Sequence, residues 1–200
     1  MQASADKKVK NFSQPKIRVL GMGGTIAGLA PDPEVPERYD AAQRSVTDLL
    51  KEVGKSQGLP ETALLKGLEI ESWQVAQIDS KDLAPGHWQV LLKALWEALS
   101  DPLVVGVVIT HGTDTLEESA SFLDEVLNRV GGPVGKPVVL TCAMRPGNAL
   151  DADGPQNLAD ALLLASSMET QARGVWVVCA GQAHAAKWVR KVHPQRLNAF

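Results

Sequence analysis

The apolar residues of this chain fall into short runs with two different spacings. Some runs are nearly continuous and rich in β-branched residues, as in 103–110 (LVVGVVIT), which is typical of a parallel strand buried on both faces. Others repeat at helical spacing, as Leu91, Leu95 and Leu99 do. The two kinds of run alternate along the chain. They predict strands over 16–22, 68–75, 103–110, 136–143 and 174–181, and helices over 45–54, 87–99, 115–132 and 157–168.

This alternation of strands and helices predicts an α/β fold. Right-handed crossovers place the strands in one doubly wound, flavodoxin-like and mostly parallel sheet with helices on both faces. In such sheets, ligands bind just beyond the carboxyl ends of the strands. The residues of interest therefore follow each predicted strand: 23–28, Ser80, 110–115, 143–154 and those after Cys179.

Composition and charge narrow the expected function. A content of 44% hydrophobic and 22% charged residues over 200 residues is that of an ordinary globular protein. We expect residues 1–15 to form a disordered polar tail and 16–200 a single α/β domain.

The net charge of -3 argues against a nucleic-acid partner. No apolar run approaches the ~20 residues that span a bilayer, and no apolar segment follows the N-terminal lysines, so we expect no membrane partner and a cytoplasmic location.

The two cysteines, Cys142 and Cys179, each lie inside an apolar strand-like run. Free cysteine is among the most buried residue types. We therefore expect two inert core thiols, and neither a disulfide scaffold nor a zinc site, because no further ligands lie near them in the sequence.

The first predicted strand ends in a glycine-rich turn, 20–28 (LGMGGTIAG). A dinucleotide fingerprint fails there because Ile26 stands at its third glycine, and a P-loop fails because Leu29 stands at its lysine. Glycines still permit a tight turn and close backbone approach, and they leave N–H groups available to an oxyanion. Thr25 is thus a candidate nucleophile, and the alternative is a threonine that only caps a turn.

A second group of polar residues follows the central strand, in 107–120 (VVITHGTDTLEESA). Hydroxyl, carboxylate and imidazole groups gather there, just before a helix whose positive end would favour a substrate carboxylate. We expect His111 to orient this turn rather than to act as a base. The alternative interpretation of Asp114 and Thr115 is that they only cap the helix.

Together, GGTIAG (23–28) and THGTDTLEESA (110–120) resemble the two signatures of the bacterial-type L-asparaginase (asparaginase/glutaminase) family. AMRPGNALDADGPQNLADAL (143–162) resembles a further block of that family, and the resemblance extends from about Lys16 to Phe200. It implies a doubly wound α/β fold and hydrolysis of L-asparagine by a threonine nucleophile, without a metal or an organic cofactor. It also implies a homodimer or homotetramer.

The resemblance assigns roles to residues in the first half of the chain. Thr25 matches the nucleophile, and Tyr39 matches the tyrosine of a mobile lid that lies beside it. The proline-rich segment 30–38 is a loop that could close over the site. Ser80 matches the serine that binds the substrate's α-carboxylate. We also place Gly24 and Gly112 among the substrate-binding residues.

Three further roles concern the second half of the site. Thr113 matches the family's second threonine, Asp114 matches the aspartate that holds the substrate's α-ammonium, and Lys191 matches a lysine that pairs with both. A threonine hydroxyl needs a partner to accept its proton. Tyr39 could do so directly, or Thr113 could do so through Lys191, and the sequence leaves this open.

The length of the chain bears on its domain form, and the resemblance leaves competing functions open. Common members of the family are about half as long again, with a C-terminal domain that lends a carboxylate to a neighbouring subunit's site; we expect a short single-domain form that lacks this domain. Weak glutaminase activity is expected, since one methylene gives only ~1–3 kcal/mol of discrimination. The competing functions are an amidotransferase component and a catalytically idle asparagine- or aspartate-binding domain. Retention of Thr25, Thr113, Asp114 and Lys191 together favours the enzyme.

Overall fold

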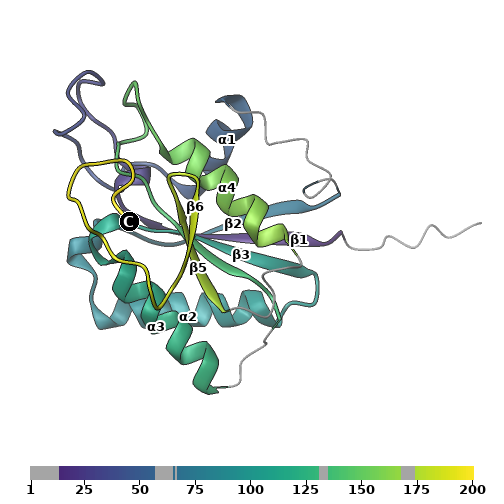
Figure 1. The fold of residues 1–200 in the computed structure, drawn as a ribbon. Helices are drawn as coiled ribbons and strands as arrows, with labels where there is room; N and C mark the ends of the chain where they lie inside the picture. Colours follow the sequence, from purple (N-terminus) through teal and green to yellow (C-terminus); the bar gives the residue numbers. More distant parts are fainter. Residues whose placement is uncertain (1–13, 57–64, 66, 131–134, 168–173) are drawn as a thin grey trace, which may run out of the picture.

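A mostly parallel sheet forms the centre of the molecule (Figure 1). The computed structural model describes residues 14–56, 65, 67–130, 135–167 and 174–200. Within these ranges the sheet has six strands in the order β2-β1-β3-β4-β5-β6. Neighbouring strands from β2 to β5 pair in parallel, and β6 pairs antiparallel with β5. The strands are β1 (Lys16–Gly23), β2 (Glu69–Ile78), β3 (Val104–Thr110), β4 (Val138–Thr141), β5 (Val175–Cys179) and β6 (Gln182–Ala185).

Helices cover both faces of this sheet. α1 (Val46–Ser56) and α4 (Gly154–Ser166) pack on one face, while α2 (Pro85–Ser100) and α3 (Leu116–Val130) pack on the other (Figure 1). Alternating side chains of the central strands supply both interfaces: Leu20 and Ile109 pack toward α2 and α3, whereas Val19 and Val108 pack toward α1 and α4. The predicted α/β, flavodoxin-like architecture is confirmed.

The predicted elements are present, and their boundaries differ in ways that have a local cause. β2 continues three residues beyond the predicted end at Val75, because a register shift lets Ile78 pair with Gly23 of β1. The helix predicted from Thr115 begins at Leu116, since Thr113–Thr115 form a short 3-10 turn, η3. Two further 3-10 turns, η1 (Thr25–Ala27) and η2 (Ser80–Asp82), follow β1 and β2.

Strand β6 was not predicted from the sequence. It returns from β5 through Ala180 and Gly181, whose φ angles of 49° and 72° are both positive. Two positive φ angles in a two-residue connection are what a tight hairpin requires, so Gly181 was the available signal. The predicted polar tail over 1–15 falls almost wholly outside the described residues. Among the helices that are described, none combines the length and apolar character needed to cross a bilayer.

The two cysteines lie side by side at the ends of adjacent strands, Cys142 just beyond β4 and Cys179 at the end of β5. Both are free and buried, as predicted. A hydrogen bond between the two thiols, together with burial, raises the pKa of the Cys142 thiol. Because the thiolate is the reactive form, this environment makes Cys142 a poor nucleophile.

Candidate active site

The site lies at the carboxyl edge of the sheet, between β1 and β3. The chain leaves β1 to form β2 on one side, and β3 pairs with β1 on the other side. Such a switch in strand order opens a crevice at the carboxyl ends of the two strands. Thr25 begins the turn just beyond β1, and Thr113 begins the turn just beyond β3. Both threonines are buried, so the fold brings the two glycine-and-threonine turns to one place.

The glycines that precede these threonines allow the two turns to touch. Gly24 has a φ of 79°, a conformation that side chains rarely adopt, and a Cβ there would lie 2.4 Å from both the N and Cα atoms of Gly112. A Cβ on Gly112 would lie 2.4 Å from the Ser80 Oγ atom. The predicted residues Gly24 and Gly112 therefore lie together behind the threonines, where their lack of side chains sets the spacing.

Replacing Gly24 by alanine should separate the two turns. We expect the free energy of unfolding to fall by at least about 1–3 kcal/mol, as in other overpacked positions, with a loss of any activity that needs both threonines. Chemical denaturation measures the first effect. Gly54→Ala is the matched control, because nothing lies within 4 Å of a Cβ there and alanine favours the helix by about 1 kcal/mol. Equal stability of the two variants would contradict the close contact.

Thr25 is in hydrogen-bond contact with the predicted lid tyrosine. Its Oγ1 atom lies 2.7 Å from the hydroxyl of Tyr39. Tyr39 belongs to the segment 29–44, which we call the lid. An isolated antiparallel bridge between Leu29 and Asp40 closes the lid at its base. In this structure the lid therefore places a second hydroxyl group next to Thr25.

Thr113 and Asp114 share one lysine. The Nζ atom of Lys191 lies 2.8 Å from Thr113 Oγ1 and 2.7 Å from an Asp114 carboxylate oxygen. The main-chain N–H of Lys191 donates to the Glu117 carboxylate at 2.6 Å, which ties this part of the chain to the first turn of α3. Lys191 lies 78 positions from Thr113 in the chain, so the fold forms the group that the sequence resemblance implied.

Ser80 is buried and braces the turn beyond β3 from the side of β2. Its Oγ atom accepts the main-chain N–H of Asp114 at 3.2 Å, and its carbonyl oxygen accepts the hydroxyl of Thr115 at 2.9 Å. The role of Thr115 was not foreseen, because its partner is a backbone atom 35 positions earlier. Ser80 keeps its own hydroxyl proton to donate to a further group.

A cavity of about 160 Å³ opens at this edge of the sheet. All five residues predicted to act in catalysis line it, and Gly24, Gly112 and Ser80 are not among its lining residues. Two carboxylates and two cationic side chains face the same space. No cluster of His, Cys, Asp or Glu that would hold a metal ion exists in the described part of the chain. The lining residues are Thr25, Pro36, Glu37, Tyr39, Thr113, Asp114, Met144, Arg145, Lys191, Pro194 and Gln195.

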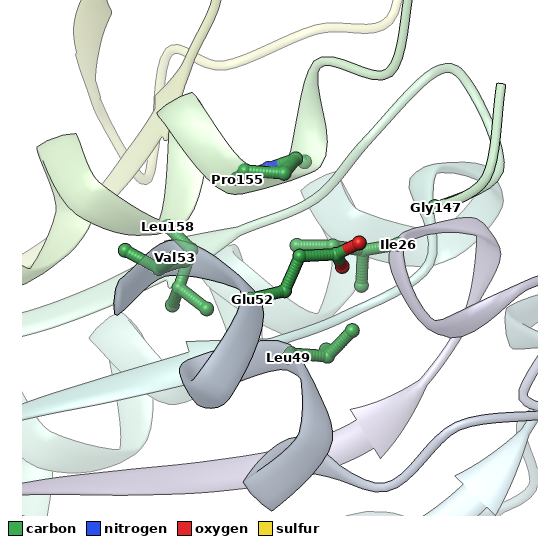
Figure 2. Close-up of a pocket in the computed structure, with 8 residues that line it drawn as sticks. Ile26, Leu49, Glu52, Val53, Gly147, Pro155 and Leu158 are labelled. Atoms are coloured by element: carbon green, nitrogen blue, oxygen red, sulfur yellow. The ribbon is translucent and has the colours of Figure 1, made fainter. Parts of the chain in front are cut away.

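A second, much smaller cavity lies beneath the Thr25 turn, between α1 and α4 (Figure 2). The side chains of Ile26, Leu49 and Leu158 surround it, and Glu52 lies along it. Its volume of about 10 Å³ is at most that of a single water molecule. This cavity is therefore a packing gap behind the turn and not a substrate site.

His111 is fully enclosed behind the turn it was predicted to orient. Its Nδ1 atom lies 2.8 Å from the carbonyl oxygen of Gly112 and so must donate its proton there, while Nε2 accepts from the hydroxyl of Ser119 at 3.0 Å. That hydroxyl in turn accepts the indole N–H of Trp88 at 3.0 Å. In this neutral tautomer both ring nitrogens form hydrogen bonds. Burial lowers the pKa of His111.

The lowered pKa of His111 makes a prediction about stability. As the pH falls below the ordinary value of 6.5, the unfolded chain takes up this proton before the folded chain does, so the free energy of unfolding falls, by up to about 1.4 kcal/mol per pH unit. His111→Gln removes this contribution. We expect the variant to be less stable at pH 8 but to lose less stability between pH 7 and pH 5.5. Urea denaturation across that range measures the slope, and equal slopes would contradict a neutral His111.

The turn that follows β4 forms another wall of the cavity, and a partly buried carboxylate holds it. Asp153 accepts the main-chain N–H groups of Met144 and Arg145 at 3.0 and 2.9 Å. It also accepts the side-chain amide of Asn157 at 3.0 Å. Burial raises the pKa of Asp153, against the opposite effect of these hydrogen bonds. The segment 143–162 was recognised as a block that resembles the family. Its sequence did not indicate that Asp153 holds the turn in place.

Known proteins of one family are similar to this chain in sequence. The family model described as "Asparaginase, N-terminal" matches residues 16–200. "Probable L-asparaginase 1" of Schizosaccharomyces pombe is 33% identical over 190 residues, which cover 95% of this chain and 49% of the relative. "Glutaminase-asparaginase" of Acinetobacter glutaminasificans is 37% identical over 182 residues, which cover 91% of this chain and 51% of the relative.

A solved structure has the same fold. It is titled "Probable Cytoplasmic L-asparaginase from Campylobacter jejuni", with a TM-score of 0.79 and 34% sequence identity. The match covers 93% of this chain and 53% of that one. The chain thus spans about half the length of the relatives it matches.

Proposed function

Because the chain belongs to the asparaginase family, we propose that it hydrolyses the side-chain amide of L-asparagine to L-aspartate and ammonia. One observation carries the proposal: three hydroxyls, a carboxylate and an ammonium converge on one cavity at the switch point of the sheet. These are the groups that acyl transfer needs, namely a nucleophile, a route for its proton and a counter-charge for the substrate.

The charges around the cavity suit a small zwitterion. The carboxylate of Asp114 would hold the α-ammonium of asparagine at the rim of the cavity. Ser80 accepts the N–H of Asp114 with its oxygen, so its own proton is available to a substrate carboxylate. A substrate held at both α-groups places its side-chain amide in the remaining part of the cavity, toward Thr25.

The hydrolysis would proceed in two steps. The Thr25 oxygen bonds to the amide carbon while its proton is relayed through the hydroxyl of Tyr39, 2.7 Å away, or through the Thr113–Lys191 pair. Either relay accepts this proton and releases one of its own toward the amide nitrogen. The carbonyl oxygen gains the electron pair, and main-chain N–H groups of the turns stabilise it. The C–N bond then breaks, the nitrogen takes a proton and leaves as ammonia, and an ester on Thr25 remains. Water adds to this ester, releasing aspartate and returning the proton to Thr25.

Ammonia release by the purified chain tests the proposal. We expect release from L-asparagine, and from L-glutamine with a kcat/KM lower by about 10- to 200-fold, since the extra methylene costs ~1–3 kcal/mol. A chain that releases no ammonia but melts at a higher temperature with L-aspartate would be a binding domain. Ammonia transfer only in the presence of a second acceptor would indicate an amidotransferase component.

We also propose a cytoplasmic homodimer or homotetramer whose partner is the small-molecule substrate. The solved Campylobacter jejuni relative, described as a probable cytoplasmic L-asparaginase, supports the location. The net charge of -3 supports the absence of a nucleic-acid partner. Light scattering coupled to size exclusion measures the assembly, and a monomer that is active at all concentrations would contradict it.

A further inference from the structure

Asn148 connects the turn after β4 to the base of the lid. Both polar atoms of its side-chain amide bond to a single residue: Oδ1 accepts the N–H of Ala30 at 2.8 Å, and Nδ2 donates to the Ala30 carbonyl oxygen at 2.7 Å. The two residues are 118 positions apart in the chain. A paired contact of this kind fixes the orientation of the Ala30 backbone as well as its distance, as a neighbouring strand would.

The residue before Asn148 extends this pairing. Gly147 donates its N–H to the Gly28 carbonyl oxygen at 2.9 Å, so two successive residues of the turn bond to positions 28 and 30. A Cβ on Gly147 would lie 2.7 Å from the Arg44 guanidinium. Arg44 closes the other end of the lid, where its N–H donates to the Ala27 carbonyl oxygen at 2.9 Å and its side chain pairs with Glu52. The first end of the lid is therefore hydrogen-bonded to the segment 147–148, and the Arg44 side chain at the other end lies close to Gly147.

A continuous set of contacts joins Asn148 to the nucleophile. Ala30 follows Leu29, which pairs with Asp40 in the antiparallel bridge, and N–H to carbonyl bonds of 3.0 Å run in both directions between them. Tyr39, whose hydroxyl lies 2.7 Å from Thr25 Oγ1, directly precedes Asp40. A change in the orientation of Ala30 would therefore move Tyr39 relative to Thr25.

We propose that Asn148 is a positioning residue, which holds the lid so that the Tyr39 hydroxyl contacts Thr25. Asn148 does not line the cavity, so it acts through the lid and not on the substrate. Its effect on turnover rests on the proposed function, whereas its effect on the position of Tyr39 does not. The two statements can fail separately, and the experiment measures both.

The single tyrosine of the chain makes this test direct. Tyrosine labelled with ¹³C at its ring Cζ atom gives one NMR signal, which reports the hydrogen bond of the Tyr39 hydroxyl. In Asn148→Ala we expect a shifted or broadened signal, and a kcat lowered by about tenfold or more, as for misplaced catalytic groups. Asn148→Asp keeps the acceptor for Ala30 and loses the donor, so we expect an intermediate effect at neutral pH.

Leu150→Ala is the matched control, because Leu150 lies in the same turn and is 83% exposed. We expect it to match the unmodified chain in signal, kcat and KM. A Tyr39 signal unchanged in every folded Asn148 variant, as judged by circular dichroism, would overturn the proposal. A signal that moves in a protein that never releases ammonia would support the positioning role and reject the proposed function.

Discussion

Thr25→Ala should abolish turnover of L-asparagine, with kcat lowered by about 10⁴-fold or more. The reason is that the nucleophile is removed, and removal of a nucleophile elsewhere leaves only the catalysis that binding and oxyanion stabilisation supply. Thr25 heads the turn beyond β1 and makes its 2.7 Å contact with Tyr39 through the hydroxyl that the variant lacks. Initial rates of ammonia release measure the effect.

Two controls separate this result from a loss of structure. Thr25→Ser keeps the hydroxyl and should retain a substantial fraction of the activity. The alanine variant should still bind L-aspartate, seen as a raised melting temperature, because Asp114 and Ser80 are unchanged. An alanine variant within tenfold of the unmodified chain would exclude Thr25 as the nucleophile.

Lys191→Met should lower kcat by about 10²- to 10⁴-fold, the range that a positioned acid–base group contributes. Its ammonium contacts both Thr113 Oγ1 and Asp114, at 2.8 and 2.7 Å. The Asp114 carboxylate is 53% exposed, so loss of this ion pair should cost only ~0–1 kcal/mol of stability. Activity should therefore fall far more than the free energy of unfolding, and parallel assays of the two quantities measure the difference.

Lys191→Arg distinguishes two roles of the lysine. A guanidinium keeps the positive charge but does not lose its proton near neutral pH. If Lys191 serves only as a charge that orients Asp114 and Thr113, the arginine variant should recover part of the activity lost in the methionine variant. If Lys191 passes a proton, the arginine variant should be as slow as the methionine variant. A methionine variant with unchanged kcat would reject both roles.

The pattern of apolar residues predicted the architecture because the sheet is buried on both faces. Strands such as 103–110 have few polar positions, and helices such as α2 show one apolar face, so the order of elements could be read directly. That order also placed Thr25, Ser80 and Thr113 at one edge of the sheet. Among the strands that the structure describes, β6 was missed, because four residues in a half-exposed hairpin carry little apolar signal.

The partners of the site residues were less accessible to sequence reasoning. Lys191 lies among Lys187, Arg190 and His193, and by its own surroundings it is an ordinary surface charge; only the family resemblance singled it out. Tyr39 was named for the same reason. Spacing along the chain carries no information about such contacts, which the fold makes between segments far apart.

The supporting residues Asn148 and Asp153 were missed for a related reason. Asn148 bonds to the backbone of Ala30, and Asp153 bonds to the backbone of the turn 144–145. Every residue type has these backbone atoms, so the sequence does not indicate which of them a side chain will contact. Sequence reasoning finds groups whose residue type suits a reaction. It does not find side chains whose work is to hold a loop in place.

A crystal structure of the chain with L-aspartate bound would test the central claim most directly. We predict the product in the cavity between β1 and β3, with its ammonium on Asp114 and its side-chain carboxyl carbon about 3–3.5 Å from Thr25 Oγ1, the distance of a reacting pair. Aspartate bound elsewhere, or turned so that its α-carboxylate faces Thr25, would contradict the account.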